Sequence, residues 1–365
     1  MTTETLKKTP LHEEHVNLHA KMVPFGGWDM PVQYEGIIAE YSQTRNAASV
    51  FDVSHMGEFI VEGDPVKSGL DNLVTMRLAD MPVNTSRYGL ILNESGTVID
   101  DTIVFRMAPQ KWFIVVNAGT TDKDREHFKK NLNKQDRFED ISSTIGKVDL
   151  QGPFARDILK NLVAQVEKLD YFAFGEFNLL GENVLISRTG YTGELGYEIF
   201  FPWNKTPQLW NALLKFNDVK PAGLGARDIL RLEVGYSLYG HEINESINPL
   251  EAGLSRFIDF EKDFIGKAAL LRIKEKGLAR KLVGIVSRSR RSPRDGFKIY
   301  APDGRGIGYV TSGTFSPVIE RGIALGYVET EFAKDKQSIL FGNDKNKEEA
   351  EVSGKIFYKK GSIKN

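Results

Sequence analysis

The chain of 365 residues contains no cysteine. That absence excludes disulfides, thiolate nucleophiles, zinc ribbons and iron–sulfur ligation, and it fits a reducing compartment. No run of apolar residues is long enough to span a bilayer. The N-terminal stretch is polar, carries both charges and lacks the apolar segment of a signal peptide. We therefore expect a cytoplasmic protein with no membrane partner.

A large excess of either charge is also missing. The 48 basic and 49 acidic residues give a net charge of −1, so the molecule as a whole is not suited to binding polyanions. A local exception consists of Arg288, Arg290, Arg291 and Arg294. The segment lacks interleaved aromatic residues, so we expect no nucleic acid partner. It is either ordinary solvated surface or a segment that attracts an anionic tail or an acidic protein.

Several catalytic motifs are absent as well. The sequence has no P-loop, no GxSxG elbow, no HExxH helix, no EF-hand loop and no GxGxxG after a leading strand. His15 and His19 have the i,i+4 spacing of a metal pair on a helix, but no carboxylate at suitable spacing completes a ligand set. We therefore predict no metal.

The length predicts two or three domains. Up to about residue 276, segments with helical spacing alternate with β-rich segments, which predicts an α+β fold of antiparallel sheets with packed helices. Beyond 276, short β-like runs alternate with glycine turns, which predicts an all-β C-terminal domain, a small barrel or jelly roll. The predicted segments are helices at 34–50, 122–134, 153–166, 207–216 and 228–236, a hairpin at 88–106, strands at 111–117, 146–150, 184–187 and 197–201, C-terminal β runs at 298–300, 308–311, 324–328, 338–341 and 355–358, and loops at 311–317 and 343–351.

Two segments carry most of the polar chemistry. Residues 188–201, RTGYTGELGYEIFF, surround Glu194 and Glu198 with glycines and tyrosines, and residues 223–240 set Arg227 on a short charged segment with further tyrosines. A carboxylate, a guanidinium and flat aromatic faces suit a planar ligand with a hydrogen-bonding edge, such as a pterin.

Two adjacent acids, Asp100 and Asp101, lie inside the apolar strand VIDDTIVF. Side chains alternate along a strand, so one acid points inward while the other is solvated. An inward carboxylate in a dry environment is costly unless it has a partner or a task. The alternative is that both acids lie at the base of a hairpin and only cap turns. The residue pattern leaves these two interpretations open.

Nine motifs follow one another along almost the whole chain at the spacing of a single family. They are FGGWDMP (25–31), FDVSHMG (51–57), the hairpin with Asp100 and Asp101, VVNA (115–118), LQGP (150–153), RTGYTGELGYEI (188–199), GLGARDILRLE (223–233), FIGK (264–267) and TSGTFSP (311–317). The sequence resembles the T-protein family of the glycine cleavage system, whose members are aminomethyltransferases.

The resemblance implies a fold and an activity. The family fold is a three-domain cloverleaf, which here implies a discontinuous first α+β domain at 1–50 and 146–275, a second α+β domain at 51–145 and a C-terminal β domain at 276–365. The family activity moves the one-carbon unit from the aminomethyl-lipoyl arm of the H-protein to tetrahydrofolate. The products are 5,10-methylenetetrahydrofolate, ammonia and dihydrolipoyl H-protein. The implied co-substrate is therefore tetrahydrofolate, and the implied partner is the lipoylated H-protein.

The resemblance also implies site residues. Asp100 matches the family's catalytic carboxylate, Glu198 matches the acid that pairs with the pterin edge, and Arg227 matches a pterin-side arginine. The wall of the folate site is implied to consist of Met56, Tyr88, Val115, Tyr191 and Tyr236.

This chain departs from the family pattern at two positions. Thr97 follows Gly96 where the hairpin usually carries a second glycine, and Lys359 replaces an arginine that faces the cavity. A lysine keeps the charge but loses the bidentate fork. Two other activities share the resemblance, a folate-dependent demethylase for small substrates and a non-catalytic folate-binding factor in iron–sulfur assembly. The second usually keeps a cysteine motif that this chain lacks.

Overall fold

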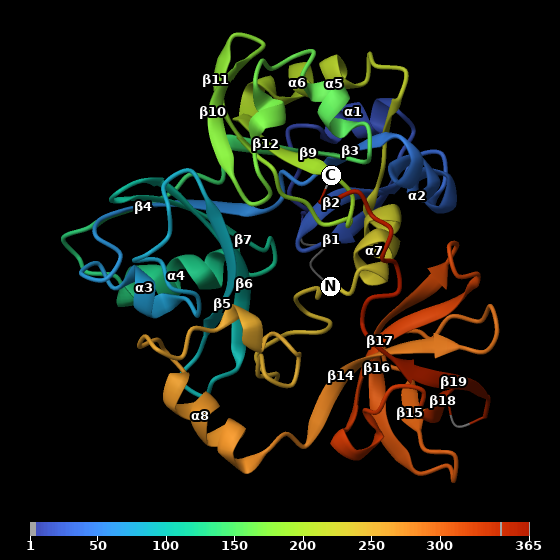
Figure 1. Cartoon of the computed structure of the whole chain (residues 1–365). Coiled ribbons are helices and arrows are strands. Elements are labelled where there is room, and N and C mark those ends of the chain that lie inside the picture. The colour runs from blue at the N-terminus through green and yellow to red at the C-terminus, as the bar shows by residue number, and fades with distance from the viewer. Residues whose placement is uncertain (1–4, 344, 365) are drawn as a thin grey trace.

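The computed structural model describes residues 5–343 and 345–364. Figure 1 shows three lobes, one around each of the three large β-structures of the chain. None of the helices within the described residues has the length and apolar composition needed to cross a membrane.

The first lobe is built on a six-stranded sheet in the order β10-β11-β12-β9-β3-β13, antiparallel except for the parallel pair β13 and β3. A small antiparallel hairpin, β1 (Lys21–Phe25) and β2 (Trp28–Gln33), lies beside it. The strands are β3 (Ala48–Asp52), β9 (Ile145–Gln151), β10 (Phe174–Leu179), β11 (Glu182–Ser187), β12 (Gly196–Pro202) and β13 (Val219–Pro221). The helices of this lobe are α1 (His12–Asn17), α2 (Ile37–Asn46), α5 (Ala155–Leu159), η1 (Val166–Lys168), η2 (Trp203–Lys205), α6 (Thr206–Leu213) and α7 (Leu224–Glu233).

The second lobe is built on a five-stranded antiparallel sheet in the order β5-β6-β7-β4-β8. Its strands are β4 (Gly57–Glu62), β5 (Ser86–Leu92), β6 (Val98–Ala108), β7 (Lys111–Val116) and β8 (Arg137–Asp140), and its helices are α3 (Leu70–Leu73) and α4 (Thr121–Asn131). In the β5–β6 hairpin, Thr97 accepts a 2.6 Å hydrogen bond from the Asn93 amide, so the departure at this position supports the turn.

The third lobe is a closed barrel in the order β14-β17-β16-β15-β18-β19. Its strands are β14 (Arg280–Ser287), β15 (Lys298–Tyr300), β16 (Gly306–Ser316), β17 (Arg321–Glu329), β18 (Ser338–Gly342) and β19 (Lys347–Ser353), with η4 (Thr330–Phe332) after β17. The linking segment carries η3 (Ser255–Phe257) and α8 (Lys267–Lys276), as Figure 1 shows. The α+β class and the C-terminal barrel predicted from the sequence are confirmed. The domain boundaries stay a prediction.

Four local predictions are wrong. The helix expected over 153–166 ends at Leu159; turns follow, and Gln165 adopts a left-handed φ of 67° that prevents the helix from continuing to Val166. The segment 311–317, expected as a loop, belongs to β16, and 355–358 forms no strand. The expected loop at 343–351 contains most of β19 among its described residues. The many acids of this segment suggested a solvated loop, but its residues alternate as in a strand, with Ala350 and Val352 in the barrel core.

Alternation of side chains gives each sheet two distinct faces. On the first sheet one face packs against helices through Val148 and Ile199, while Phe200 belongs to a separate cluster. On the second sheet one face packs against α4 through Ile114, and the other contributes Phe113 to that separate cluster. We call the two faces that meet in this cluster the inner faces. Polar residues on the inner faces therefore lie between two lobes.

Candidate active site

The two adjacent aspartates of β6 point to opposite sides of the second sheet. Asp101 pairs with Leu90 and Ile103 pairs with both Tyr88 and Val115, so these side chains share the inner face. Met56 packs against the same inner cluster. The structure thus brings together Tyr88, Val115, Met56 and Asp101, and it places Asp100 on the α4 side.

Asp101 is the half-buried acid of the inner face. Its Oδ1 accepts a 2.8 Å hydrogen bond from Asn117 Nδ2, and the Tyr88 hydroxyl is within hydrogen-bonding reach. Burial, reinforced by the negative charge of Asp100, raises the pKa of Asp101 to about 7. Asp101 can therefore exist in either protonation state near neutral pH.

Asp100 is fully buried, and both of its carboxylate oxygens accept hydrogen bonds from neighbouring protein groups. Its Oδ2 accepts from the Asn117 backbone N–H at 2.9 Å and the Thr120 hydroxyl at 2.7 Å, and its Oδ1 accepts from Asn117 Nδ2 at 2.8 Å. These bonds tie β6 to the turn that leads into α4. Asp100 thereby satisfies the Asn117 N–H and the Thr120 hydroxyl just before the helix begins.

Glu198 lies on the inner face of the first sheet, on β12. Its carboxylate accepts from Lys147 Nζ at 3.0 Å and from the Thr189 hydroxyl at 2.7 Å. Burial opposes ionisation, but the Lys147 charge and the Thr189 hydrogen bond outweigh it and hold the pKa of Glu198 below its usual range. Lys147 Nζ also lies 3.6 Å from Met56 Sδ, which connects this acid to the second lobe.

Arg227 on α7 lies near Glu198, and its positive charge helps to keep that acid ionised. Its guanidinium binds Asp149 Oδ2 at 2.9 Å and lies 4.9 Å from the centre of the Tyr191 ring. Tyr191 in turn stacks on Tyr236, with ring centres 5.7 Å apart and planes inclined by 30°. The buried Asp149 Oδ1 meets no donor within the described residues. Burial and the charge of Glu198 raise the pKa of Asp149 to about 6.

We call these groups together the inner-face site. It contains every cofactor-binding residue predicted from the sequence, together with three residues that the sequence analysis missed: Asn117, Lys147 and Asp149. Lys147 and Asp149 alternate with the core residues Val148 and Leu150 along β9. That period-two pattern of charged and apolar residues was the available signal.

Glu194, Arg231 and Glu233, further charged residues of the two glycine-rich segments, are structural. Glu194 accepts from Arg45 at 2.8 Å, and Arg45 also binds Glu233 at 2.7 Å. Arg231 is held by Glu242 at 2.7 Å. These groups are buried and mutually paired, so they contribute to packing between segments rather than to a ligand surface.

The remaining predicted residues lie away from the inner-face site. Lys359 is exposed and lines a separate hollow near the barrel. His15 hydrogen-bonds Asp52 at 2.8 Å and lies on α1, which ends before His19. Among residues 5–343 and 345–364 no group of three potential metal ligands is assembled.

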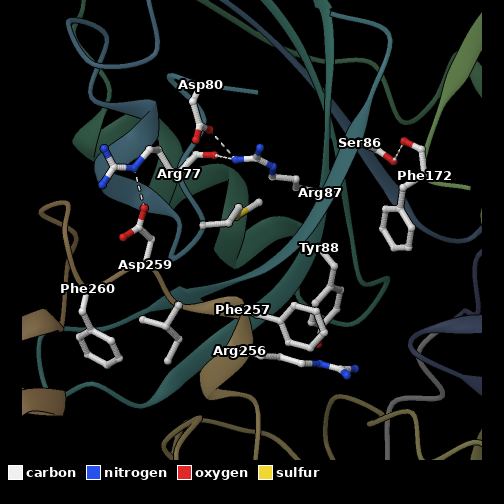
Figure 2. Close-up of a pocket in the computed structure, with 12 residues that line it drawn as sticks. Arg77, Asp80, Ser86, Arg87, Tyr88, Phe172, Arg256, Phe257, Asp259 and Phe260 are labelled. Carbon is white, nitrogen blue, oxygen red and sulfur yellow. Dashed lines mark hydrogen bonds and ion pairs between the residues drawn. The ribbon is translucent and has the colours of Figure 1, made fainter. Parts of the chain in front are cut away.

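A pocket of about 520 Å³ opens next to Tyr88. Figure 2 shows Tyr88 against Phe257, and the two rings meet edge to face with centres 4.6 Å apart. Arg87 and Asp80 form an ion pair of 2.6 Å at its rim. Aromatic rings and guanidinium groups dominate the lining, which consists of Met76, Arg77, Asp80, Ser86, Arg87, Tyr88, Phe172, Arg256, Phe257, Ile258, Asp259 and Phe260.

Comparisons with known proteins define the class of this molecule. The family model described as the GCVT N-terminal domain matches residues 11–262, and the glycine cleavage T-protein C-terminal barrel domain matches residues 280–359. The two models together cover most of the chain, including both sheets of the inner-face site and the barrel.

Individual relatives agree with the family models. The chain is 42% identical over 366 residues to an aminomethyltransferase of Caldanaerobacter subterraneus, covering 98% of this chain and 97% of the relative. It is 43% identical over 339 residues to the aminomethyltransferase of Halothermothrix orenii, covering 92% and 95%. The crystal structure of glycine cleavage system aminomethyltransferase T from Bartonella henselae superposes with a TM-score of 0.93 at 32% identity, covering 98% of this chain and 99% of that one.

The chain belongs to the aminomethyltransferase, or T-protein, family of the glycine cleavage system. The resemblance inferred from nine sequence motifs is thereby confirmed, and so is the expected activity, that of an aminomethyltransferase.

Proposed function

We propose that this chain transfers the one-carbon unit from the aminomethyl-lipoyl arm of the H-protein to tetrahydrofolate. The observation that carries the proposal is the inner-face site, in which Asp101 and an ionised Glu198 lie on two facing sheets among tyrosines. Such a site offers a hydrogen-bonding edge, flat apolar walls and an acid whose pKa lies near neutral pH.

The bonds of the reaction balance without an oxidant. Carbon loses its bonds to the lipoyl sulfur and to the amino nitrogen, and it gains bonds to N5 and N10 of the folate. The two folate nitrogens release two protons, one of which ends on ammonia and one on the dihydrolipoyl sulfur. The protein therefore has to orient the folate, stabilise a cationic intermediate and handle protons.

Glu198 and Arg227 are proposed to hold the pterin. Two of the lone-pair positions of the Glu198 carboxylate are used by Lys147 and Thr189, which leaves two for the N3–H and 2-amino donors of the ring. A low pKa keeps this carboxylate ionised and strengthens those bonds. Arg227 is fixed by Asp149 and presents its remaining donors.

The ring of the folate is proposed to pack among apolar and aromatic side chains. Tyr191 and Tyr236 already stack on each other, so they offer a preformed flat surface. Met56 and Val115 supply adaptable apolar contact from the second lobe. Tyr88 stands between this wall and the pocket beside Phe257, which we propose as the approach from solvent.

We assign the catalytic role to Asp101, although the sequence motif had suggested Asp100. Asp101 lies on the face shared with Tyr88 and Val115, whereas Asp100 lies on the opposite face with its oxygens engaged. A carboxylate at Asp101 can orient the reactive folate nitrogens and stabilise the iminium cation formed as ammonia leaves. Its near-neutral pKa also suits proton transfer.

A donor-choice assay tests the proposal. The purified chain is given tetrahydrofolate with either aminomethylated H-protein or small methylated amines, and ammonia and 5,10-methylenetetrahydrofolate are quantified. We expect stoichiometric formation of both products with the H-protein donor. Turnover with the small donors alone would favour a demethylase, and folate binding without turnover would favour a non-catalytic factor. A cytoplasmic location, the lack of nucleic acid partners and the proposed domain boundaries stay predictions.

A further inference from the structure

A second acid lies behind Asp100, and the hydroxyl near it, that of Thr120, donates to Asp100 instead. Asp124, in the first turns of α4, is completely buried, and neither of its carboxyl oxygens meets a donor within the described part of the chain. Its carboxyl group is within hydrogen-bonding reach of the Asp100 carboxyl. Two buried carboxyl groups in contact do not both ionise, so the pair shares one proton.

The donors around the pair decide which acid holds that proton. Asp100 receives three hydrogen bonds, two from Asn117 and one from Thr120, as an anion requires. Among the described residues, Asp124 has only the Thr120 hydroxyl within reach, which already donates to Asp100 at 2.7 Å, and burial together with the Asp100 charge raises the pKa of Asp124 to about 10. The proton therefore resides on Asp124, whose O–H donates to Asp100.

Asn117 connects this pair to the inner-face site. Its side-chain nitrogen donates to Asp100 Oδ1 at 2.8 Å and to Asp101 Oδ1 at 2.8 Å. A continuous series of hydrogen bonds thus runs from Asp124 through Asp100 and Asn117 to Asp101. Within the described residues, Asn117 is the side-chain amide that donates to Asp101 from the α4 side.

We propose that Asp124 is a positioning residue, a buried neutral acid that keeps Asp100 anionic and so fixes the orientation and protonation of Asp101. This inference rests on the role proposed for Asp101. Other titratable groups that face the series are Tyr88 and Tyr191 on the inner side and Tyr239 with Lys123 on the outer side. Lys123 Nζ bonds Tyr239 at 2.9 Å and also Glu245, and its charge only partly offsets the rise in the pKa of Asp124.

The direction of the effect follows from the charge of Asp100. Removing the Asp124 donor leaves Asp100 with fewer hydrogen bonds in a dry environment, so Asp100 takes up the proton itself. The negative charge that raises the pKa of Asp101 is then lost, and Asp101 ionises at lower pH. Replacement by asparagine keeps an N–H donor and preserves the arrangement.

Carboxyl titration by NMR tests this in the full chain labelled with 13C-aspartate, with the Asp101 signal assigned by its loss in Asp101→Asn. We expect Asp124→Leu to move the titration of Asp101, and the acid limb of the pH–turnover profile, to lower pH by about one unit. Asp124→Asn should keep the wild-type titration. Asp122→Asn, an exposed acid on the same helix, is the control.

If Asp124→Leu does not fold, Thr120→Val removes one donor from Asp100 and should shift Asp101 in the same direction by less. An unchanged Asp101 titration in the folded variant, or an equal shift in Asp124→Asn, would overturn the inference. Failure of the role proposed for Asp101 is a separate result. It would appear as normal turnover in Asp101→Asn, while the titration still reports on the series.

Discussion

Asp100 and Asp101 are neighbours in sequence but meet different surroundings. Asp100 joins a dry network of backbone and hydroxyl donors at the start of α4, and Asp101 faces tyrosines on the inner face. The same chemical group therefore stabilises a turn in one position and is available to a ligand in the next. The period of two along a β-strand is the physical origin of this division.

At the same scale, Glu198 should control folate affinity. Glu198→Gln replaces an acceptor-only group by one that presents a donor to the ring edge, and it leaves Lys147 buried without its counter-ion. We expect the tetrahydrofolate dissociation constant to rise roughly 10- to 100-fold, or about 1.4–3 kcal/mol. Calorimetric titration measures it. Glu176→Gln, an exposed acid on the same sheet, should bind normally; equal affinity in both variants would contradict the role of Glu198.

Asp124 should make stability depend on pH. Its pKa is about 10 in the folded protein against an ordinary value of 3.8, so the folded state binds the proton more tightly. The free energy of unfolding then falls as pH rises through this interval, by up to about 1.4 kcal/mol per pH unit. Asp124→Asn removes this slope. Urea unfolding between pH 5 and 8 measures this. The free energy of unfolding of the variant relative to wild type should increase as pH rises. A difference that does not change with pH would count against a protonated Asp124.

Residue-level chemistry was only partly predictable from the sequence. Glu198 and Arg227 stand in glycine-rich segments whose composition signals a ligand, and both lie in the inner-face site. The pattern VIDDTIVF predicts that the two acids face opposite sides, but it contains no information on which side meets the other lobe. That choice depends on how β5 and β7 pair with β6, which is a tertiary property.

At the scale of elements, one arginine joins three segments. Arg45 on α2 binds Glu194 in the glycine-rich loop and Glu233 at the end of α7, and its guanidinium lies 4.1 Å from the ring centre of Tyr358 in the C-terminal segment. Both carboxylates are almost completely buried. Buried ion pairs of this kind fix the relative placement of elements even where their net energy is small.

Loss of Arg45 should lower the stability of the fold because it leaves two buried acids, Glu194 and Glu233, without their positive partner. We expect Arg45→Met to reduce the free energy of unfolding by about 3–5 kcal/mol. Lys220→Met, which removes an exposed 3.0 Å pair with Glu35, should cost less than about 1 kcal/mol. Urea unfolding of both variants gives the comparison. A similar small loss in each would show that the Arg45 network is not required.

Element type was more predictable than element length. The β5–β6 hairpin and α6 follow clear periodicity and turn residues, and both formed as expected. The helix after Pro153 is shorter than its apolar spacing suggests: it ends at Leu159, and turns separate it from η1, which follows a left-handed Gln165. In β19, Glu349 and Glu351 on the outer face pair with Arg288 just after the end of the neighbouring strand β14, and this partnership cannot be seen in the local sequence.

At the scale of the whole molecule, the barrel carries the arginine-rich segment, and part of its positive charge is neutralised by ion pairs. Arg288 binds Glu349 at 2.7 Å and Arg291 binds Glu348 at 2.9 Å. Arg290 and Arg294 are exposed and have no ion pair within the described residues. Any electrostatic attraction of the H-protein by this segment should therefore come mainly from these two side chains.

Charge reversal tests that attraction. The double variant Arg290→Glu, Arg294→Glu should weaken association with the H-protein several-fold at low salt, and the difference should shrink above about 0.15 M salt as screening increases. The same charge change on α8, Arg272→Glu with Lys276→Glu, is the control. Equal association of both variants at low salt would identify the segment as ordinary surface.

The arrangement of lobes brings residues from positions 56 to 236 to one place between two sheets. The most direct test is turnover of Asp101→Asn with aminomethylated H-protein and tetrahydrofolate, measured beside folate binding by the same protein. We predict normal folding and nearly normal folate affinity with turnover reduced about 100- to 10,000-fold. Turnover close to wild type in a folded, folate-binding Asp101→Asn protein would contradict the assignment of the catalytic acid to the inner face.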